Sequence, residues 1–562
     1  MNQLYFGDNL QVLRDHLATE TVDLIYLDPP FNSKRDYNLL FKSPKGHESE
    51  AQITAFEDSW HWGEQAEGEY DEILKGQNTD LAEMMRSFRS FLKENDMMAY
   101  LTMMANRLLQ LHRVLKPTGS LYLHCDPTAS HYLKIVLDGV FGKTNFRSEI
   151  NWRRSSAHND AKQGRKQYGN VRDIIFFYTK SDEWNWKWLY TPYTVEYLES
   201  EYRHKTKAGK YFKETDLTAN KPGGDVSYEW RVKRKAGERW EADLDDEYKN
   251  PKSGFEYDGV RPYQGRYWAY SRQNLIEFAK AGKLQHRSTG MPRLVQYADE
   301  MPGVPLQNDW QDIPPALGES LGYDTQKPLA LLERIIAASS NEGDVVLDPF
   351  CGCGTAVHAA QKLNRRWIGT DITHLAISLI EKRLKDSFGA KCQFEVQGTP
   401  KDLDAARNLA TRDKYQFQWW AVSLVDAQPF QGKKKGADGG IDGLKFFHDV
   451  DKAGARKIVV SVKGGGTLKA DDVRSLMAVR EREGAEVALF ISLEEPTRGM
   501  IADAASAGYY ESATGKKYPR VQLLTIEGLL SDKQRAEHPD HAPDLNFKKA
   551  KQEAHGKQKE LL

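Results

Sequence analysis

The feature that most constrains the fold is an ordered series of elements within residues 345–371. An apolar run from Val345 to Leu347 predicts a buried strand, and a glycine-containing loop, Asp348 to Thr355, follows it. A helix is expected to begin near Ala356, and a second strand after it ends in Asp371. Strand, glycine loop, helix and terminal acid in this order predict an α/β fold that binds a ligand at the carboxyl edge of its sheet.

This loop has the chemistry of a small-molecule site. Glycines let the backbone approach a ligand closely, and the helix N-terminus offers free N–H groups. Asp371 can accept hydrogen bonds from ribose hydroxyls, although the glycine spacing differs from the dinucleotide pattern Gly-x-Gly-x-x-Gly. Cys351 and Cys353 lack a partner pair, so we expect small loop residues there rather than metal ligands.

A second acid follows a strand near the N-terminus. The apolar run Val22 to Leu27 predicts a buried strand that delivers Asp28, and Pro29, Pro30 and Phe31 come directly after it. The prolines stiffen the chain and leave carbonyls free, and Phe31 offers a flat ring. Carboxylate, carbonyl and ring together suit a planar base with an exocyclic amino group. The alternative is an ordinary tight turn with a capping Asp.

The rest of residues 1–150 predicts further α/β elements. We expect a strand ending in Asp8, a helix over 9–17 and a long helical stretch over 81–115 that is interrupted near Asn95. The segment 35–80 is polar and aromatic without a sustained period, which predicts a mobile loop over the site. A strand over 120–126 and a helix over 130–141 complete this part.

These motifs resemble those of one enzyme family. Asp28-Pro29-Pro30-Phe31 resembles the catalytic tetrapeptide of the amino-group DNA methyltransferases, which modify adenine N6 or cytosine N4. The run 113–126 closely resembles the post-catalytic segment of the permuted β class, in which the catalytic motif precedes the cofactor motif, and 145–150 fits its continuation. The resemblance covers nearly all of residues 1–395 and implies a doubly wound, Rossmann-like sheet.

The resemblance also implies a cofactor, S-adenosylmethionine. Asp348-Pro349-Phe350 and the following glycines resemble the family's cofactor loop, and Thr325-Gln326-Lys327-Pro328 resembles a short motif beside it. The family places Asp8 near the adenine of the cofactor and Asp371 on its ribose. The cofactor-binding residues expected on this basis are Asp8, Lys327, Pro328, Asp348, Phe350, Gly352, Gly354, Thr355 and Asp371.

The implied reaction is base flipping followed by direct methyl transfer to an amino group. Asp28 and the Pro29 carbonyl are expected to accept hydrogen bonds from the amine, with Pro30 and Phe31 completing the site. Adenine N6 is favoured because family members with an initial Asp mostly act on adenine, and cytosine N4 stays the alternative. Methylation of a protein or small molecule is a further alternative.

Residues 151–324 interleave aromatic and basic side chains, for example in Trp184 to Trp188 and Trp230 to Lys235. Basic groups beside stacking surfaces suit nucleic acid, since charge binds phosphates and rings stack on bases. The resemblance places the target-recognition region here. The alternative is a polar insertion whose tryptophans fill a small core.

Residues 408–535 predict a separate α/β domain. Gly440-Ile441-Asp442-Gly443 precedes a strand that ends in Ser461-Val462-Lys463, and the pattern resembles the Mrr-type restriction-endonuclease fold. In that fold an acid and a lysine on neighbouring strands suit phosphodiester hydrolysis with Mg²⁺, so Asp442 is the expected metal ligand. Ser461 stands where Glu or Gln is usual, and Gln418 stands where a helix often carries Glu. Active nuclease, DNA- or protein-binding relic and unrelated loop all stay open.

The overall composition indicates the cellular environment and the possible partners of the protein. Lys and Arg number 79 against 80 Asp and Glu, so a DNA-binding surface must come from local clustering. The first residues lack a basic region followed by an apolar core, so we expect no signal peptide; no run approaches the ~20 apolar residues of a membrane helix, and four cysteines fit a reducing interior. We expect a cytoplasmic, bacterial or phage-encoded enzyme of double-stranded DNA, with a homodimer open. The expected domains are 1–150, 151–324, 325–400 and 408–535, with a charged tail over 536–562.

Overall fold

The computed structural model describes most of the chain. For strands β3 (Asp36–Lys42) and β4 (Glu48–Glu57), which pair antiparallel, it describes the backbone alone. The other described residues are 1–30, 61–155, 166, 168–221, 228–316, 319, 326–430, 440–449, 455–539 and 553. Within these ranges, none of the helices combines the length and the apolar character that crossing a membrane requires.

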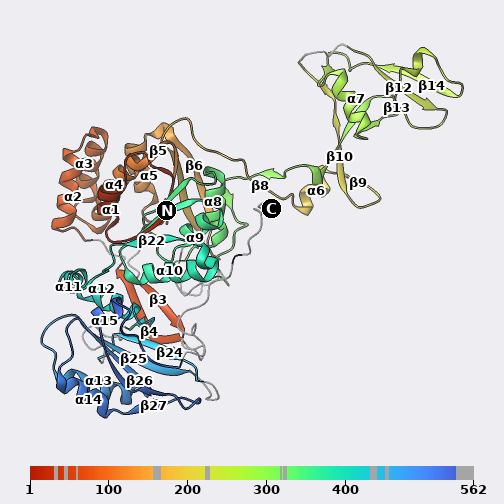
Figure 1. Ribbon diagram of the computed structural model, residues 1–562. Helices are drawn as coiled ribbons and strands as arrows, with labels where there is room; N and C mark the ends of the chain where they lie inside the picture. The colour runs from red at the N-terminus through yellow and green to blue at the C-terminus, as the bar shows by residue number, and fades with distance from the viewer. Residues whose placement is uncertain are drawn as a thin grey trace. The chain divides into compact units, whose positions relative to one another are not determined.

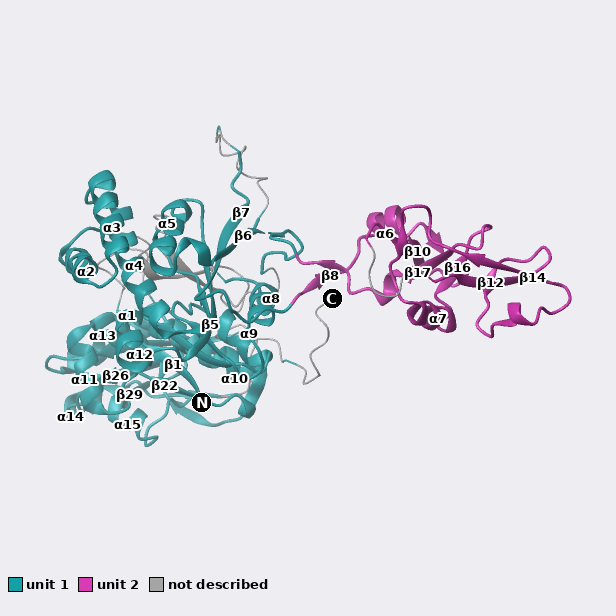
Figure 2. Cartoon of the chain, turned by 90° about the horizontal axis from the view of Figure 1, so that it is seen from above, with its two compact units in different colours: residues 1–187, 307–558 teal, residues 188–306, 559–562 magenta. Residues whose placement is uncertain are grey.

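The chain forms two compact units, which Figure 2 colours teal and magenta. Unit 1 comprises residues 1–187 and 307–558, and unit 2 comprises residues 188–306 and 559–562.

A nine-stranded sheet organises the first part of unit 1 (Figure 1). Its strand order is β19-β6-β7-β5-β2-β20-β21-β1-β22, and only β7 runs antiparallel to its neighbours. Strands β20 and β21, which come late in the sequence, therefore lie between β2 and β1, which come early. The bounds are β1 Asn2–Phe6, β2 Val22–Leu27, β5 Leu115–Cys125, β6 Phe146–Arg153, β7 Arg172–Thr179, β19 Asp309–Trp310, β20 Val345–Asp348, β21 Arg366–Asp371 and β22 Phe394–Gln397.

Helices cover both faces of this sheet, as expected for a doubly wound fold. One face packs on α1, α4 and α5 through a large apolar core, and α2 and α3 lie against α4. The other face packs on α8, α9 and α10. The bounds are α1 Asn9–His16, α2 Glu64–Lys75, α3 Thr79–Leu92, α4 Asp96–Val114, α5 Ser130–Phe141, α8 Leu329–Ser339, α9 Thr355–Lys362 and α10 His374–Phe388.

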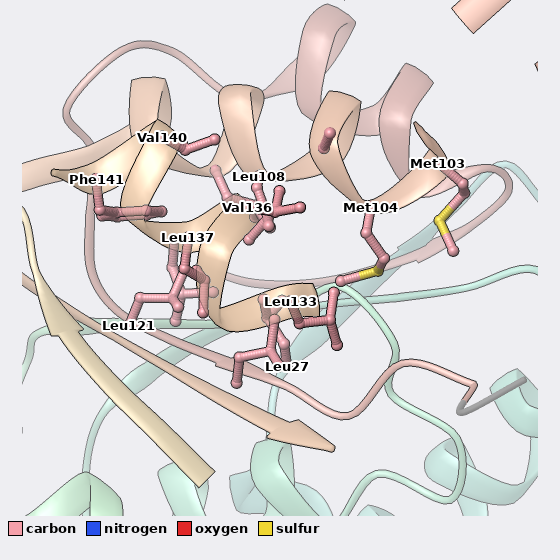
Figure 3. Packing of buried hydrophobic residues seen from close by; sticks show 14 of the residues in the cluster. Leu27, Met103, Met104, Leu108, Leu121, Leu133, Val136, Leu137, Val140 and Phe141 are labelled. Atoms are coloured by element: carbon pink, nitrogen blue, oxygen red, sulfur yellow. The ribbon is translucent and has the colours of Figure 1, made fainter. Parts of the chain in front are cut away.

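Strand alternation decides which side chains enter the large core. Figure 3 shows Leu27 at the end of β2 and Leu121 of β5 packed against Leu133 and Leu137 of α5, with Leu108 of α4 nearby. All five are fully buried. The residues that alternate with them on β2 and β5 therefore face the α8 side of the sheet.

Asparagine side chains cap the N-termini of α3 and α4, the two helices of the stretch that the sequence predicts to be helical. Asn78 accepts a hydrogen bond from the Leu81 N–H and begins α3, and Asn95 accepts from the Met98 N–H and begins α4. The interruption expected near Asn95 is thereby confirmed.

The expectation of an irregular loop over 35–80 is wrong. This segment contains β3, β4 and α2, and α2 buries Tyr70 and Ile73 against α4. The helix carries few apolar positions among many acids, so its period is weak in the sequence, and tertiary packing supplies the stability that the pattern does not show.

Unit 2 has a small core of its own. Trp268 and Val232 are fully buried and Trp230 is 3% exposed, with Leu217 and Leu275 beside them. Short antiparallel strands surround this core. The bounds are β8 Tyr190–Thr191, α6 Val195–Glu201, β9 His204–Lys205, β10 Tyr211–Asp216, β11 Thr218–Ala219, β12 Trp230–Lys235, β13 Glu241–Ala242, β14 Phe255–Val260, β15 Tyr267–Trp268, α7 Arg272–Lys280, β16 Leu284–His286, β17 Pro292–Tyr297 and β18 Val304–Pro305.

The last part of unit 1 contains a second, five-stranded sheet of order β23-β24-β25-β26-β29. Helix α13 packs on it together with α14, around Val459 and Phe490. The bounds are α11 Leu403–Arg412, α12 Lys414–Ser423, β23 Gln428–Pro429, β24 Gly443–Phe447, β25 Arg456–Lys463, α13 Ala470–Arg482, β26 Val487–Ser492, α14 Arg498–Ser506, β27 Tyr509–Glu511, β28 Lys517–Pro519, β29 Val521–Thr525 and α15 Ile526–Leu530.

Candidate active site

Two acids from distant parts of the chain meet at one edge of the large sheet. Strands β2 and β20 pair in parallel, with Ile25 opposite Leu347, so Asp28 and Asp348 both lie at their carboxyl ends. The Asp28 side chain is 18% exposed, whereas Asp348 is 3% exposed. The sheet thus places the half-buried Asp28 side chain next to the buried carboxyl group of Asp348.

Asp28 is paired with a lysine from the short motif before α8. The Lys327 ammonium donates to Asp28 Oδ2 at 2.6 Å, and the lysine side chain is 10% exposed. Pro29 is buried behind the acid and Pro30 is half-buried. Phe31 and Thr325 lie outside the described residues.

Asp348 is held in a neutral form. Burial raises the pKa of its carboxyl to about 8, against a hydrogen bond from the Phe350 N–H, and the charges of Asp28 and Asp371 raise it further. A protonated Asp348 can sit beside the Asp28 carboxylate without a second negative charge.

Replacing Asp348 with Asn is expected to remove a pH dependence of stability. Between the ordinary aspartate pKa of about 3.9 and the raised value, the folded state binds one more proton than the unfolded state, so stability falls as pH rises through this window. Asn keeps the acceptor for Phe350 and does not titrate. Melting temperatures at about pH 6 and about pH 8 should therefore drop more for wild type than for D348N. Equal drops in the two proteins would contradict the assignment.

The loop between β20 and α9 uses glycine where the backbone requires it. Gly352 has φ +51° and Gly354 has φ +76°, both in the left-handed region. A Cβ on Gly354 would also lie 2.7 Å from Ile380 of α10. Phe350 follows Asp348, and Thr355 begins α9. Cys351 and Cys353 are buried, and burial raises the pKa of both thiols, so they stay protonated.

Asp371 fastens this loop to the end of β21. Its Oδ2 accepts from the Gly352 N–H at 2.9 Å, and its Oδ1 accepts from the N–H and the hydroxyl of Thr373, both at 2.9 Å. Burial raises the pKa of Asp371 to about 6, and these donors limit the increase. The acid expected on the ribose therefore also shapes the loop.

Asp8 lies at the same edge, because Phe6 is opposite Asp371 in the β1–β21 pair. Its Oδ1 caps α1 by accepting from the Leu10 N–H at 2.9 Å, and its Oδ2 accepts from Arg107 at 2.8 Å. Arg107 also donates to Asn9 Oδ1 at 2.6 Å.

Asn9 in turn donates to the Pro349 carbonyl at 2.8 Å. Side chains of α4 and α1 thereby hold the loop between β20 and α9 from one side.

A second buried arginine supports the loop from behind. Arg383 of α10 is 4% exposed and donates to the Cys353 carbonyl and the Thr355 hydroxyl, both at 3.1 Å. Neither Arg107 nor Arg383 was found from the sequence. Each interrupts an otherwise apolar helix face, which is the signal that could have revealed a buried, paired charge.

The basic and aromatic residues of unit 2 divide between core and surface. Trp230 and Trp268 fill its core. Several basic side chains of β12 pair with acids, such as Lys233 with Glu247 at 3.0 Å and Arg234 with Glu256 at 2.6 Å. Arg261 is mostly exposed, and so is Trp188.

In the last part of unit 1, Asp442 directly precedes β24 and lies beside β25, where its N–H donates to the Val460 carbonyl at 2.8 Å. Its Oδ1 accepts from Gln418 of α12 at 3.0 Å, and its Oδ2 accepts from the Val462 N–H at 2.6 Å and from the Ser461 hydroxyl at 3.4 Å. Lys463 donates instead to Asp472 of α13, at 3.0 Å. The expected residues are close in the fold, but the lysine is bound to an acid that the sequence did not single out.

Comparison with known proteins decides the family. Residues 22–382, more than half of the chain, match the model of the DNA methylases that act at N6 and N4. The chain belongs to the DNA methylase family. Residues 409–530 of this DNA methylase match the model of a restriction endonuclease domain of the Mrr type.

Several relatives and solved structures resemble this DNA methylase. The type II methyltransferase M.EcaI of Enterobacter cloacae is 30% identical over 288 residues, 51% of this chain and 57% of the relative. The type III restriction-modification enzyme StyLTI Mod subunit of Salmonella typhimurium is 26% identical over 380 residues, 65% of this chain and 50% of the relative. The chain therefore spans about half the length of these curated relatives.

Among solved structures, a Thermus thermophilus protein described as a DNA modification methylase and complexed with S-adenosylmethionine shares 14% identity. Its TM-score is 0.33, over 71% of this chain and 100% of that one.

Proposed function

We propose that this DNA methylase transfers the methyl group of S-adenosylmethionine to the N6 amino group of adenine in double-stranded DNA. The observation that carries the proposal is the pairing of β2 with β20, which puts Asp28 beside the start of the glycine loop at Asp348. An acceptor for an amine and a loop suited to a nucleoside cofactor then share one sheet edge.

The loop residues fit that cofactor. Gly352 and Gly354 leave the backbone accessible, and the carboxylates of Asp371 and Asp8 offer acceptors for hydroxyl and amino groups at the same edge. Phe350, which packs against the large apolar core, and Pro328, at the start of α8, are the remaining residues that we assign to the cofactor. When bound, the cofactor supplies an electrophilic methyl group on a sulfonium.

Asp28 acts on the target base in this proposal. A flipped base directs its amino group at the Asp28 carboxylate and the Pro29 carbonyl, which accept its hydrogens and orient the nitrogen lone pair toward the methyl group. Lys327 neutralises Asp28 before the base arrives and shares the carboxylate with the amine afterwards. Phe31 remains the proposed stacking surface.

We choose adenine because members of the family whose tetrapeptide begins with Asp, as this one does at Asp28, mostly act on adenine. Cytosine N4 is the other possibility. We assign target recognition to residues 151–324, of which 188–306 form the compact unit 2. Exposed side chains such as Arg261 and Trp188 support a role in binding DNA.

The test uses purified protein, labelled S-adenosylmethionine and unmethylated genomic DNA that is digested to nucleosides afterwards. Label in N6-methyladenine is the expected result. Label in N4-methylcytosine alone would keep the mechanism and overturn the base. An absence of label in DNA would overturn the proposed function.

A second candidate function, DNA cleavage by the endonuclease domain, is favoured by the proximity of Asp442 to the strand that carries Lys463. The residues described around Asp442 supply an amide, a hydroxyl and a backbone N–H. Within the described ranges no cluster of three His, Cys, Asp or Glu residues forms a metal site. These donors do not complete a shell for Mg²⁺, and we derive no step through the metal.

Strand breaks measured with and without Mg²⁺ decide between cleavage and binding alone. If the domain cleaves, wild type should nick DNA with Mg²⁺ and Lys463→Ala should lose the nicking while its methyl transfer stays intact. The matched control is Lys469→Ala, at the N-cap of α13 on the same segment. Intact DNA with wild type would leave this domain as a binding module.

A further inference from the structure

A chain of buried polar side chains crosses the large sheet beneath the catalytic edge. The Tyr26 hydroxyl lies 3.0 Å from His124 Nδ1, and His124 Nε2 lies 3.1 Å from Asp173 Oδ2. Tyr26, His124 and Asp173 are each no more than 2% exposed. Buried polar groups are costly unless they are paired, so a chain of this kind is retained for what it holds in place.

These hydrogen-bonded side chains lie on the face of the sheet opposite to the large apolar core. Leu27, Leu123 and Tyr178 belong to that core, so Tyr26 and His124 point to the opposite side. Asp173 lies there too, because Ile174, next to it on β7, packs against the core. Asp348 shares this side, since Leu347 before it enters the core.

The hydrogen-bonded side chains come from adjacent strands, beginning beside Asp28 and continuing toward the β6 side of the sheet. Tyr26 comes two residues before Asp28 on β2, His124 lies on β5, and Asp173 lies on β7. Arg154, directly after β6, completes it with its Nε 3.2 Å from Asp173 Oδ1. β2, β5, β7 and β6 are consecutive in the sheet order.

The proton positions follow from the charges. Burial acts to raise the pKa of Asp173, but the hydrogen bond from His124 and the charges of His124, Lys327 and Arg154 together outweigh it and lower that pKa. Asp173 is therefore a carboxylate and accepts from His124 Nε2–H. Burial raises the pKa of Tyr26, and the charges of Asp28 and Asp173 raise it further, so its hydroxyl keeps its proton. The Tyr26 hydroxyl and His124 Nδ1, 3.0 Å apart, share one hydrogen bond.

We propose that His124 is a positioning residue for methyl transfer, which fixes the end of β2 through Tyr26 and thereby sets the direction of the Asp28 carboxylate. The inference rests on the proposed function. Reacting groups must be held to a fraction of an ångström, and displacement by about 1 Å can cost about a hundredfold in rate. Tyr26 and His124 touch neither base nor cofactor in this proposal, and they act through Asp28.

The test is Tyr26→Phe, with Tyr122→Phe as the matched control. Tyr122 is opposite Tyr26 in the β2–β5 pair, is equally buried, and also makes one buried hydroxyl hydrogen bond, to Ser339 Oγ at 2.7 Å. Each variant removes one buried hydroxyl, so their melting temperatures should fall by similar amounts. Only Y26F breaks the chain to His124.

The measurements are single-turnover methyl transfer, KM for S-adenosylmethionine and melting temperature. Y26F should lose roughly tenfold to a hundredfold in transfer rate with KM within about twofold, while Y122F stays within about twofold of wild type. Asp173→Asn should lower the rate similarly, and the double variant Y26F/D173N should lose less than the product of the two, because both break one chain.

Equal rates for Y26F and Y122F would overturn the inference. A Y26F defect confined to KM would overturn it too. Failure of the proposed function is distinguishable, because wild type itself would then transfer no methyl group to DNA.

Discussion

Asp28→Asn is expected to abolish detectable methyl transfer while S-adenosylmethionine still binds with near-normal affinity. Loss of a single preorganised hydrogen-bonding group in a transition state costs on the order of a hundredfold to a thousandfold, and in the proposed mechanism Asp28 supplies both charge and acceptor to the attacking amine. The cofactor loop lies on a different strand, so its affinity should change by less than about twofold, as seen by titration calorimetry.

The control for this variant is an acid near the other end of β2. Asp23 is buried and paired with a lysine, with Lys116 Nζ 2.8 Å from its Oδ1, whereas Asp28 directly follows the carboxyl end of the strand. Asp23→Asn should lower stability and leave the transfer rate per folded molecule close to wild type. Near-normal turnover by D28N would remove Asp28 from the mechanism.

Asp371→Ala is expected to weaken S-adenosylmethionine binding by about tenfold to a hundredfold. The variant removes the acceptor for Gly352 and Thr373, and each buried donor left without a partner costs about 1–3 kcal/mol. The glycine loop then loses its fixed shape, and an acceptor proposed for the cofactor is lost with it. Calorimetric titration with the cofactor in the absence of DNA measures the effect directly.

Asp402→Ala serves as the control for that experiment. Asp402 caps α11 by accepting from the Ala405 N–H at 2.8 Å, so its loss removes a capping acid outside the β20–β21 loop. D402A should bind the cofactor as wild type does. If D371A also did, Asp371 would be neither a loop anchor nor a cofactor ligand.

The sequence predicted those parts of the fold whose signals are local. The βαβ unit that contains Asp348 and Asp371 was found because strand, glycine loop, helix and acid follow one another within 345–371. The starts of α3 and α4 were predictable because Asn78 and Asn95 stand directly before them. Helix α2 was missed, since its stability comes from Tyr70 and Ile73 packing on α4.

Contacts between residues that are far apart in the sequence could not be predicted from the sequence. Lys327 was expected beside the cofactor on family resemblance, yet its ammonium pairs with Asp28, 299 residues away. Similarly, nothing near Lys463 in the sequence distinguishes Asp472, in the first turn of α13, from any other helix-capping acid. Such pairings depend on strand order and side-chain direction, which local patterns do not specify.

The place of β20 between β2 and β21 has a consequence for how the enzyme is made. A ribosome releases β2 early, but the edge of β2 on the β20 side has no partner until the chain has grown past Asp348; Val345 and Asp23, which bond across this edge, are 322 residues apart. An unpaired strand edge is a place where a growing chain can associate wrongly, so we expect this edge to be exposed to such association until β20 is made. The acid proposed for the base and the loop proposed for the cofactor therefore come together only when β20 pairs with β2, so a nascent chain that ends before β20 lacks the complete site.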